Sequence, residues 1–482
     1  MEGFGFTLAD NTYLREDPDG YFLLSKLPLR ILRINKPLFQ LLKHLQEGGG
    51  LSEFISQNPG LEEGRWLRVL LSLVSKGYLK LERIAELEDY PKVSIVIPVR
   101  DQPRDIIECI QSLANLNYPE DKFEVIVVDD GSRNNLSDVV SSFNVRVIRL
   151  DESQGASVCR NIGAENACGD ILAFLDADCM ADKNWLREII PFFKTATVGA
   201  VGGYVDGYYR DSYLDRYEEV SSSLNMGKRF LLEGDTESNF YVPSCNILIT
   251  RQAFMATGGF KSGMRVGEDV DFCWRMRKLG YTLLYIPFGR VAHKHRNKLF
   301  KMLKRRSDYG TSEALLYLSH RDKRKTFLIS IYAGLSFLAL TLSILLLNPY
   351  PIYLILLLFG LDLFRKSRTL KKFKMVLPLR QIAYAVLRSY FSFYYFTLFH
   401  LVRYYLVLMC GLGFLVHSIW FFVGLAILFT SIVDYYVKRP NLPYSVFLIL
   451  YVLEHLAYQL GVFWGCLKLR DFRAYIPVFS YA

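Results

Sequence analysis

The sequence lacks the paired cysteines of a zinc or redox site. Its eight cysteines are scattered singly, and no Cys-x-x-Cys pair occurs among them. This usage fits a catalytic region that is kept reduced, as in the cytosol. The first thirty residues also lack an uninterrupted apolar run and carry charges throughout. We therefore expect no signal peptide at that end.

Also missing is a G-x-G-x-x-G motif after the first strand of the predicted α/β region, which disfavours a dinucleotide-binding Rossmann domain.

What the chain does have is length and apolar content. Its 482 residues are enough for two or three domains. A hydrophobic content of 51% and a mean hydropathy of +0.15 are high for a soluble protein. Part of the chain is therefore expected to lie in a membrane.

The net charge of +10 is concentrated in two segments. Arg296–Lys325 holds ten Lys and Arg against three acids, and Arg365–Arg380 holds seven against none. Basic clusters beside apolar spans are typical of the cytoplasmic face and of contact with anionic lipid. Nucleic acid is the poorer explanation, and a solvated basic face is the alternative. We expect a multi-pass cell-membrane protein with a cytoplasmic catalytic region and no nucleic-acid partner.

Apolar runs predict a membrane region over residues 326–482. Thr326–Leu347 is 22 residues without a charge, which is long enough to span, whereas Ile352–Phe364 is short and contains Asp362. Ile382–Val437 has room for two further spans, and Tyr444–Leu467 is a last candidate. Four or five spans are expected.

Residues 1–88 show short extended patterns followed by three helical patterns and the alternating strand YLKLE, as in a winged-helix-like unit. The third helix carries only Arg65 and Arg68 as basic residues, so DNA binding is a poor interpretation. The arrangement resembles the PqqD-like peptide-recognition fold. That resemblance implies a module that docks a peptide or a protein.

From Pro91, strands and helices alternate as in βαβ units, which predicts an α/β domain over residues 91–325. The apolar run Ile171–Phe174 reads as a buried strand that leads to Asp176 and Asp178. Two such carboxylates can hold a hard divalent cation beside phosphate oxygens, although a solvated turn is the alternative. Acids also follow two earlier predicted strands, at Asp101 and at Asp129-Asp130. These strand ends are expected to converge at one edge of the sheet.

Five motifs in this order resemble the signature of family-two, GT-A-fold inverting glycosyltransferases. They are SIVIPVRDQP, VIVVDDGS, GASVCRNIG, FLDADC and GEDVDFCWR. The resemblance covers about residues 93–295 and implies a UDP-sugar donor and a divalent metal, Mn²⁺ or Mg²⁺. The usual Tyr-Asn after the first strand is replaced here by Arg100-Asp101, which puts the role of Asp101 in doubt.

The resemblance also implies roles for particular residues. His293 and His295 alternate on an extended segment, and the family sometimes uses a histidine there as a ligand; a surface pair is the alternative. Arg160 is a candidate cation near the sugar, with a helix-surface arginine as the alternative. The donor-binding set is Pro98, Asp101, Asp129, Asp130, Arg160 and Asp176, and the metal set is Asp176, Asp178, His293 and His295.

On the acceptor side, the family pattern places a carboxylate across the sugar from the diphosphate, at Asp269, where it serves as general base. The alternative is that the acids of Gly267–Asp271 only cap a helix. Asn246, Glu268 and Trp274 are predicted to contact the acceptor, although a turn amide is the other interpretation of Asn246.

Processive synthases of this family carry Gln-x-x-Arg-Trp after the base, and this chain has Cys273–Arg277 instead. That favours transfer of one or a few sugars to a discrete acceptor. The order of docking-like unit, GT-A domain and membrane region resembles the glycosyltransferases of the mycofactocin system. It implies transfer of a sugar, with glucose favoured, to a peptide-derived redox cofactor or its precursor. A lipid or cell-wall acceptor is the alternative, and a non-catalytic peptide-binding membrane protein is a third.

Overall fold

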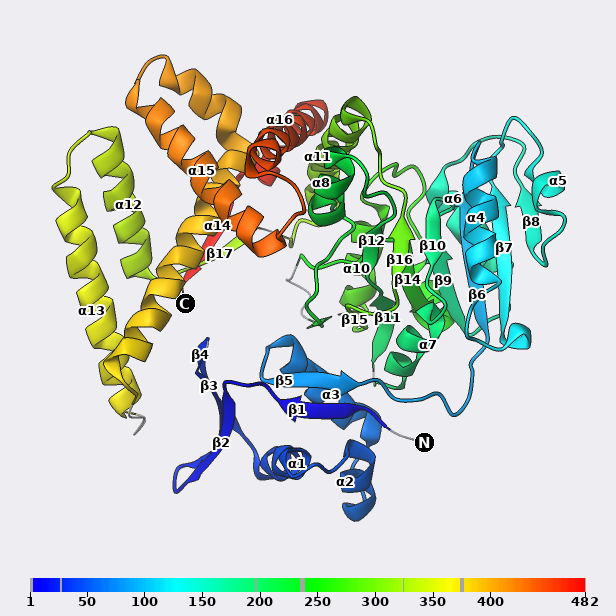
Figure 1. The fold of residues 1–482 in the computed structure, drawn as a ribbon, viewed down its shortest axis with the longest axis horizontal. Coiled ribbons are helices and arrows are strands. Elements are labelled where there is room, and N and C mark those ends of the chain that lie inside the picture. The colour runs from blue at the N-terminus through cyan, green and yellow to red at the C-terminus, as the bar shows by residue number, and fades with distance from the viewer. Residues whose placement is uncertain are drawn as a thin grey trace. The chain divides into compact units, whose positions relative to one another are not determined.

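The computed structural model describes residues 3–26, 28–195, 197–234, 239–323, 325–372 and 377–481 (Figure 1). Arg324 and Lys374, which belong to the two basic segments, lie outside the described residues. The chain divides into two compact units. The first comprises Met1–Leu24, Leu32–Asp211 and Glu218–His295, and the second comprises Ser25–Ile31, Ser212–Tyr217 and Arg296–Ala482.

The N-terminal residues form four short strands, three helices and a fifth strand, in agreement with the predicted extended patterns, helices and YLKLE strand. Asn35 caps the first helix, because its side-chain oxygen accepts from the Leu38 N–H at 3.0 Å. The second helix begins at Leu51, so Ser52 lies in its first turn. The elements are β1 (Gly5–Leu8), β2 (Thr12–Asp17), β3 (Gly20–Lys26), β4 (Leu29–Ile34), α1 (Lys36–Gln46), α2 (Leu51–Gln57), α3 (Glu63–Ser75) and β5 (Leu79–Arg83).

An eight-stranded mixed sheet follows, and it confirms the predicted α/β class. Four neighbouring strands are parallel, so their carboxyl ends lie at one edge: β9 (Ile171–Leu175), β6 (Val93–Val99), β7 (Phe123–Asp129) and β8 (Arg146–Arg149). All residues of β6 and β9 are buried, as expected for continuous apolar runs covered on both faces. The other half contains β13 (Leu231–Glu233), β15 (Thr282–Tyr285), β11 (Val198–Gly202) and β14 (Asn246–Thr250).

Helices pack closely against this sheet. A Cβ on Gly163 would lie 2.3 Å from a methyl carbon of Val96, so only glycine lets its helix approach β6 this closely. The final glycine of GASVCRNIG is thus explained by packing. The helices of this region are α4 (Pro103–Leu113), α5 (Leu136–Val140), α6 (Ala156–Glu165), α7 (Trp185–Ile189), α8 (Tyr213–Ser221) and α9 (Arg251–Thr257).

The chain enters a second, three-stranded sheet directly after the Asp-x-Asp motif. It consists of β10 (Cys179–Ala181), β16 (Val291–His293) and β12 (Val205–Gly207), with β16 in the middle. Cys179 is paired with His293 in this sheet. The pairing brings a segment more than one hundred residues away beside the end of the FLDADC motif.

Helix α10 (Glu268–Lys278) begins after Gly267, whose φ of 81° is in the left-handed region that favours glycine. Its first turn carries Glu268, Asp269 and Asp271. Carboxylates at this end of a helix are stabilised by the helix dipole. Asp271 is held by Arg275 at 2.8 Å, one turn later.

The N-terminal elements share a hydrophobic core with the α/β sheet. The Phe4 and Phe192 rings lie 5.2 Å apart, and both side chains are buried. The Leu232 N–H, on β13, donates to Ser75 Oγ at 3.1 Å. Apart from Ser25–Ile31, the residues before Pro91 therefore belong to the first compact unit and add to its stability.

This packing predicts a loss of stability in Phe4→Ala. Truncating a buried phenylalanine removes contacts with Phe192 and leaves a cavity, at a cost of about 3 kcal/mol in the free energy of unfolding. The detergent-purified protein is expected to unfold at a lower temperature. Met255→Ala is the matched control, because Met255 is 59% exposed and its truncation is expected to change the midpoint little. Equal midpoints for both variants would contradict a shared core.

The second unit is mainly helical. Three of its helices, as far as the structure describes the chain, are long and apolar enough to cross a membrane: α14 (Leu379–Gly413), α15 (Ser418–Lys438) and α16 (Tyr444–Leu469). The prediction of four or five spans is therefore too high. The remaining elements are α11 (Leu299–Ser319), β17 (Thr326–Ile329), α12 (Ile331–Leu345), α13 (Pro351–Lys372) and β18 (Val478–Tyr481).

The predicted 22-residue span Thr326–Leu347 is wrong. Its first residues form β17, which pairs in parallel with β18, and the helix that follows has only 15 residues. The partner strand lies about 150 residues away, so hydropathy alone does not reveal it.

Candidate functional site

Acidic side chains gather at the carboxyl edge of the parallel strands, as predicted. Asp129 ends β7 and is fully buried; one carboxylate oxygen accepts from the Ser132 N–H at 2.9 Å, and the other lies 3.5 Å from Arg149. The Asp130 carboxylate accepts from the N–H groups of Gln154 and Gly155 and from the Ser153 hydroxyl, which all lie just before α6. These bonds hold the DDGS turn against the loop before α6.

Asp101 lies at the same edge of the sheet, two residues after the end of β6. Its φ of 52° is unusual for a residue with a side chain, and two hydrogen bonds accompany it. The Asp101 N–H donates to Ser132 Oγ at 2.9 Å, and its carboxylate accepts from the Arg133 N–H at 2.9 Å. Pro98 is buried in β6, opposite Val128 of β7. In this structure Asp101 therefore connects two loops, and its role in donor binding stays a prediction.

Arg160 links two of the predicted carboxylates. It donates to Asp176 at 2.7 Å and to Glu268, at the start of α10, at 3.0 Å. Its side chain is 3% exposed, so it is not a surface arginine. Burial alone would lower the Arg160 pKa, but the charges of Asp176 and Glu268 raise it above its ordinary value. A fixed positive charge therefore lies between the Asp-x-Asp motif and α10.

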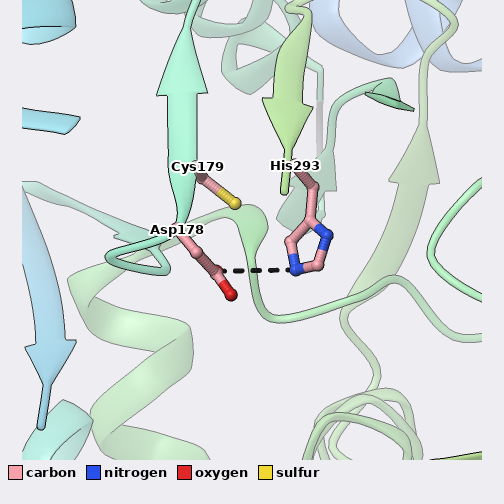
Figure 2. A group of neighbouring side chains, drawn as sticks. All are labelled: Asp178, Cys179 and His293. Carbon is pink, nitrogen blue, oxygen red and sulfur yellow. Dashed lines mark ion pairs between the residues drawn. The ribbon is translucent and has the colours of Figure 1, made fainter. Parts of the chain in front are cut away.

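Asp178, Cys179 and His293 form a compact group of possible metal ligands (Figure 2). Their ligand atoms all lie within 4.8 Å of one another, and His293 Nε2 is 3.5 Å from an Asp178 oxygen. Burial and a hydrogen bond with Cys245 raise the pKa of the Cys179 thiol well above its ordinary value. The carboxylate and the imidazole are therefore the donors that suit Mn²⁺. Mg²⁺ prefers oxygen ligands and suits this set less well.

His295 is buried and contacts His293. The two Nδ1 atoms are 3.1 Å apart, so each ring has its Nδ1 turned toward the other. A hydrogen bond to one ring nitrogen fixes which tautomer a histidine adopts and how the ring is turned. With Nδ1 occupied in this way, His293 presents Nε2 to Asp178.

Lys294, between the two histidines, was not singled out from the sequence. Its ammonium contacts Asp105 at 2.7 Å and Glu108 at 2.8 Å, both on α4. Burial alone would lower the Lys294 pKa, but these hydrogen bonds raise it above its ordinary value. The alternation His-Lys-His in an extended segment was the available signal, since the middle side chain must point away from its neighbours.

Asp269 is partly buried at the first turn of α10, and its carboxylate accepts from the Val270 N–H at 2.8 Å. Burial, followed by the charge of Glu268, raises the pKa of Asp269 from 3.8 to about 7, although Arg160 opposes this. A carboxylate with this pKa exchanges its proton near neutral pH, as a general base requires. Capping alone does not explain such a value.

Asn246 and Trp274 are less open than predicted. The Asn246 oxygen accepts from the Trp185 indole at 2.8 Å, and its amide donates to the carbonyls of Tyr204 and Gly289. The side chain is fully buried, so contact with an acceptor would require one of these bonds to break. Trp274 is 4% exposed. Their acceptor roles stay predictions.

Residues 94–264 match the model of Glycosyl transferase family 2. This part of the chain is a family 2 glycosyltransferase domain. The match and the eight-stranded mixed sheet together confirm the predicted GT-A-like α/β fold. Asp176, Asp178 and Arg160 lie inside the matched stretch. Asp269 and His293 lie beyond it, so their assignment depends on the geometry.

Two relatives and one solved structure are similar to this chain. A pre-mycofactocin glycosyltransferase of Mycobacterium tuberculosis is 36% identical over 247 residues, which are 49% of this chain and 50% of that protein. The chain thus spans half the length of that relative. Glycosyltransferase AglE of Haloferax volcanii is 28% identical over 52% of this chain and 82% of its own length. A mannosyltransferase of Pyrobaculum calidifontis, solved with GDP-Man and Mn²⁺, is 16% identical with a TM-score of 0.39, over 67% of this chain and 98% of its own.

Proposed function

We propose that this protein is a membrane-anchored, metal-dependent, inverting glycosyltransferase that moves a sugar from a UDP-sugar to a discrete acceptor. One observation carries the proposal. Asp269, with a pKa raised to about 7, is coupled through Glu268 and Arg160 to Asp176 of the Asp-x-Asp motif. A proton acceptor and a charge-bearing donor site are therefore connected within a few contacts.

The donor side is proposed to use Asp178 and His293 as metal ligands, with Asp176 beside them. A bound divalent cation would stabilise the charge that develops on the leaving diphosphate. Arg160 holds the Asp176 carboxylate in a fixed direction through a 2.7 Å contact. His295 orients His293 through the Nδ1 contact. Asp129, Asp130, Asp101 and Pro98 are proposed to border the nucleoside.

On the acceptor side, Asp269 is proposed to remove the proton of the attacking hydroxyl. Its carboxylate must be ionised to do so, and a pKa near 7 keeps a large share ionised at neutral pH while leaving it a stronger base than an ordinary carboxylate. The charge of Glu268 helps to raise the pKa of Asp269. Glu268 is itself held by Arg160 at 3.0 Å. Direct attack from the face opposite the diphosphate inverts the anomeric centre.

The acceptor is proposed to be mycofactocin or a precursor of it, and the sugar to be glucose. Supporting this are the name of the 36% identical relative and the winged-helix-like order of residues 1–88, which are proposed to dock a peptide or protein. A lipid or cell-wall acceptor is the second candidate, and the three long apolar helices favour it because they keep the enzyme near membrane lipids.

Donor hydrolysis and acceptor transfer test these points separately. The full-length protein in detergent, given UDP-glucose with Mn²⁺, is expected to release UDP, and omission of the metal should abolish the release. A non-catalytic binding protein would release none. Mass spectrometry of small-molecule glycosides lost on deleting the protein then identifies the acceptor. Loss of a lipid-linked glycoside alone would favour the second candidate.

Replacing Arg160 with glutamine is expected to shift the pH dependence of turnover. Its charge lowers the pKa of Asp269, so Arg160→Gln should raise that pKa. The rise of kcat with pH should therefore move to higher pH, by about one unit or more. Arg160→Lys keeps the charge and is the matched control, with a smaller shift expected. Identical pH profiles in the wild type and Arg160→Gln would show that another group controls the rate.

A further inference from the structure

The strand pair β17–β18 restricts how the second unit meets a membrane. The two strands are parallel and adjacent, with Thr326 opposite Val478. The Val478 N–H donates to the Lys325 carbonyl at 2.8 Å, and Lys325 Nζ donates to the Ala474 carbonyl at 2.7 Å. Paired strands lie on the same side of a bilayer. The chain between them must therefore cross the bilayer an even number of times or not at all.

Helix α16 is packed against a helix that is too polar to enter lipid. A Cβ on Gly461 would lie 2.0 Å from the Ser307 carbonyl, and one on Gly465 would lie 2.5 Å from that of Thr311, so the backbones of α16 and α11 touch. Contacts that advance together along both helices make the pair parallel. Helix α11 carries the charged residues Lys301, Lys304, Arg305, Arg306, Asp308 and Glu313.

If α16 crossed the bilayer, α11 would have to cross with it, which its charges oppose. Polar contacts on α16 indicate the same arrangement. Glu454 is buried and accepts from the Tyr217 hydroxyl at 2.7 Å, and it lies 3.3 Å from Arg306 on α11. The loop before α16 is fixed too, because Arg216 donates to the Asn441 carbonyl at 3.3 Å. Arg216 and Tyr217 continue directly into the first unit at Glu218.

Both ends of α16 therefore lie on the side of the catalytic region. Its start contacts Ser212–Tyr217, which the chain connects at both ends to the first unit. Its end leads to β18 and so to β17, which follows α11. Helix α11 itself begins four residues after His295, the last residue of the first unit.

The other long helices form two hairpins, α12–α13 and α14–α15 (Figure 1). Helix α12 begins directly after β17, and its 15 residues extend about 22 Å, less than the roughly 30 Å of a bilayer core. The turn of the second hairpin is tied to the far end of α12, because Ser418 Oγ donates to the Leu345 carbonyl at 2.7 Å. The short α12 therefore limits how deep both turns can lie, provided that its start stays at the membrane surface.

Both turns begin with exposed apolar residues, which suit lipid, although each also holds one polar residue, Asn348 or His417. Leu346 and Leu347 follow α12, and Phe414 and Leu415 follow α14; all four are largely exposed, with Leu415 at 80%. The base of the first hairpin is basic instead. The last two turns of α13 carry Arg365, Lys366, Arg368, Lys371 and Lys372. Such residues bind anionic headgroups.

We propose that the second unit anchors the protein in one leaflet only. The α12–α13 and α14–α15 hairpins enter the bilayer from the side of the catalytic region and return to it. Helix α16 stays on that side against α11, and none of the described helices crosses completely. Phospholipid surrounds the apolar turns, and anionic headgroups contact the basic end of α13. This arrangement replaces the multi-pass topology expected from hydropathy.

Cysteine labelling of the full-length protein in sealed inverted membrane vesicles tests the proposal. Cys168 is exposed on the catalytic unit and marks its side. In a Cys410→Ser background, single cysteines are introduced as Asn441→Cys and Lys468→Cys at the two ends of α16. Two more, Leu346→Cys and Leu415→Cys, probe the turns. An impermeant maleimide is added outside, inside after opening, or in detergent, and labelled peptides are quantified by mass spectrometry.

Both α16 variants are expected to react from the face on which Cys168 reacts. The turn variants should react at least ten-fold less than Cys168 from either face and fully in detergent. Reaction of Lys468→Cys only from the face opposite Asn441→Cys would show that α16 crosses and would overturn the proposal. Reaction of either turn variant from the opposite face would overturn it as well, because the hairpin would then emerge there.

Discussion

Replacing Asp269 with asparagine is expected to lower kcat by about 10²-fold to 10⁴-fold, the usual contribution of a general base. Asn keeps the size of the side chain and accepts the Val270 N–H, but it has no basic lone pair to take a proton. In the wild type, burial and Glu268 raise the pKa of Asp269 to about 7. The catalytically active carboxylate therefore forms as pH rises, and kcat should increase with pH up to about 7 and then level off. In Asp269→Asn this rise should disappear.

Donor binding separates a chemical defect from a structural one. UDP affinity measured by calorimetry should be unchanged in Asp269→Asn, because the carboxylate is proposed to act on the acceptor. Asp271→Asn is the comparison within the same helix, since Asp271 is buried and paired with Arg275 at 2.8 Å; that change should affect stability more than the pH profile. Full turnover with a normal pH profile in Asp269→Asn would place the base elsewhere.

The parallel half of the sheet was predictable because each of its strands carries a local signal. Val93–Val99, Phe123–Asp129 and Ile171–Leu175 are short apolar runs that end in acids or a turn. Once such strands are parallel, geometry brings their carboxyl ends together. The convergence of Asp129 and Asp176 at one edge followed from that rule alone.

The contacts that define the site's electrostatics have no such local signal. Arg160 and Glu268 are 108 residues apart, and no period or motif indicates that they touch. The same holds for Asp178 and His293, which meet only because β16 is paired with β10. The raised pKa of Asp269 depends on burial and on these long-range charges. It therefore could not be predicted before the fold was known.

The predicted membrane span Thr326–Leu347 was wrong for a related reason. Hydropathy measures whether a segment tolerates lipid, and Thr326–Leu347 does. It does not measure whether backbone groups have another partner. Residues 326–329 pair with residues 478–481 as strands. The helix that follows is therefore shorter than the apolar run, and the two paired segments lie at the same depth relative to a bilayer. Pairing between distant segments thus decided the length of the apolar helix.

Replacing Asp178 with alanine is expected to remove the effect of Mn²⁺ on UDP binding. The remaining ligand, His293, gives a single neutral donor, while Asp176 is engaged by Arg160 at 2.7 Å. Loss of a carboxylate next to His293 therefore leaves too little negative charge to hold a divalent cation. UDP affinity with Mn²⁺ should fall by about 100-fold or more, to the level seen without metal. Calorimetric titration, and the electron-spin resonance signal of free Mn²⁺ without nucleotide, both measure this.

The two histidines should rank below Asp178 and in a fixed order. His293→Ala removes a direct donor 3.5 Å from Asp178, whereas His295→Ala removes only the group that orients His293. Loss of such a supporting contact typically weakens metal affinity by about 10-fold to 100-fold. Asp121→Ala, at an exposed position away from the Asp-x-Asp strand, is the control and should bind Mn²⁺ normally. A larger loss in His295→Ala than in His293→Ala would mean that His295 is the ligand, with His293 as its support. Unchanged Mn²⁺ binding in Asp178→Ala would reject the metal site, because the group formed with Cys179 and His293 depends on that carboxylate.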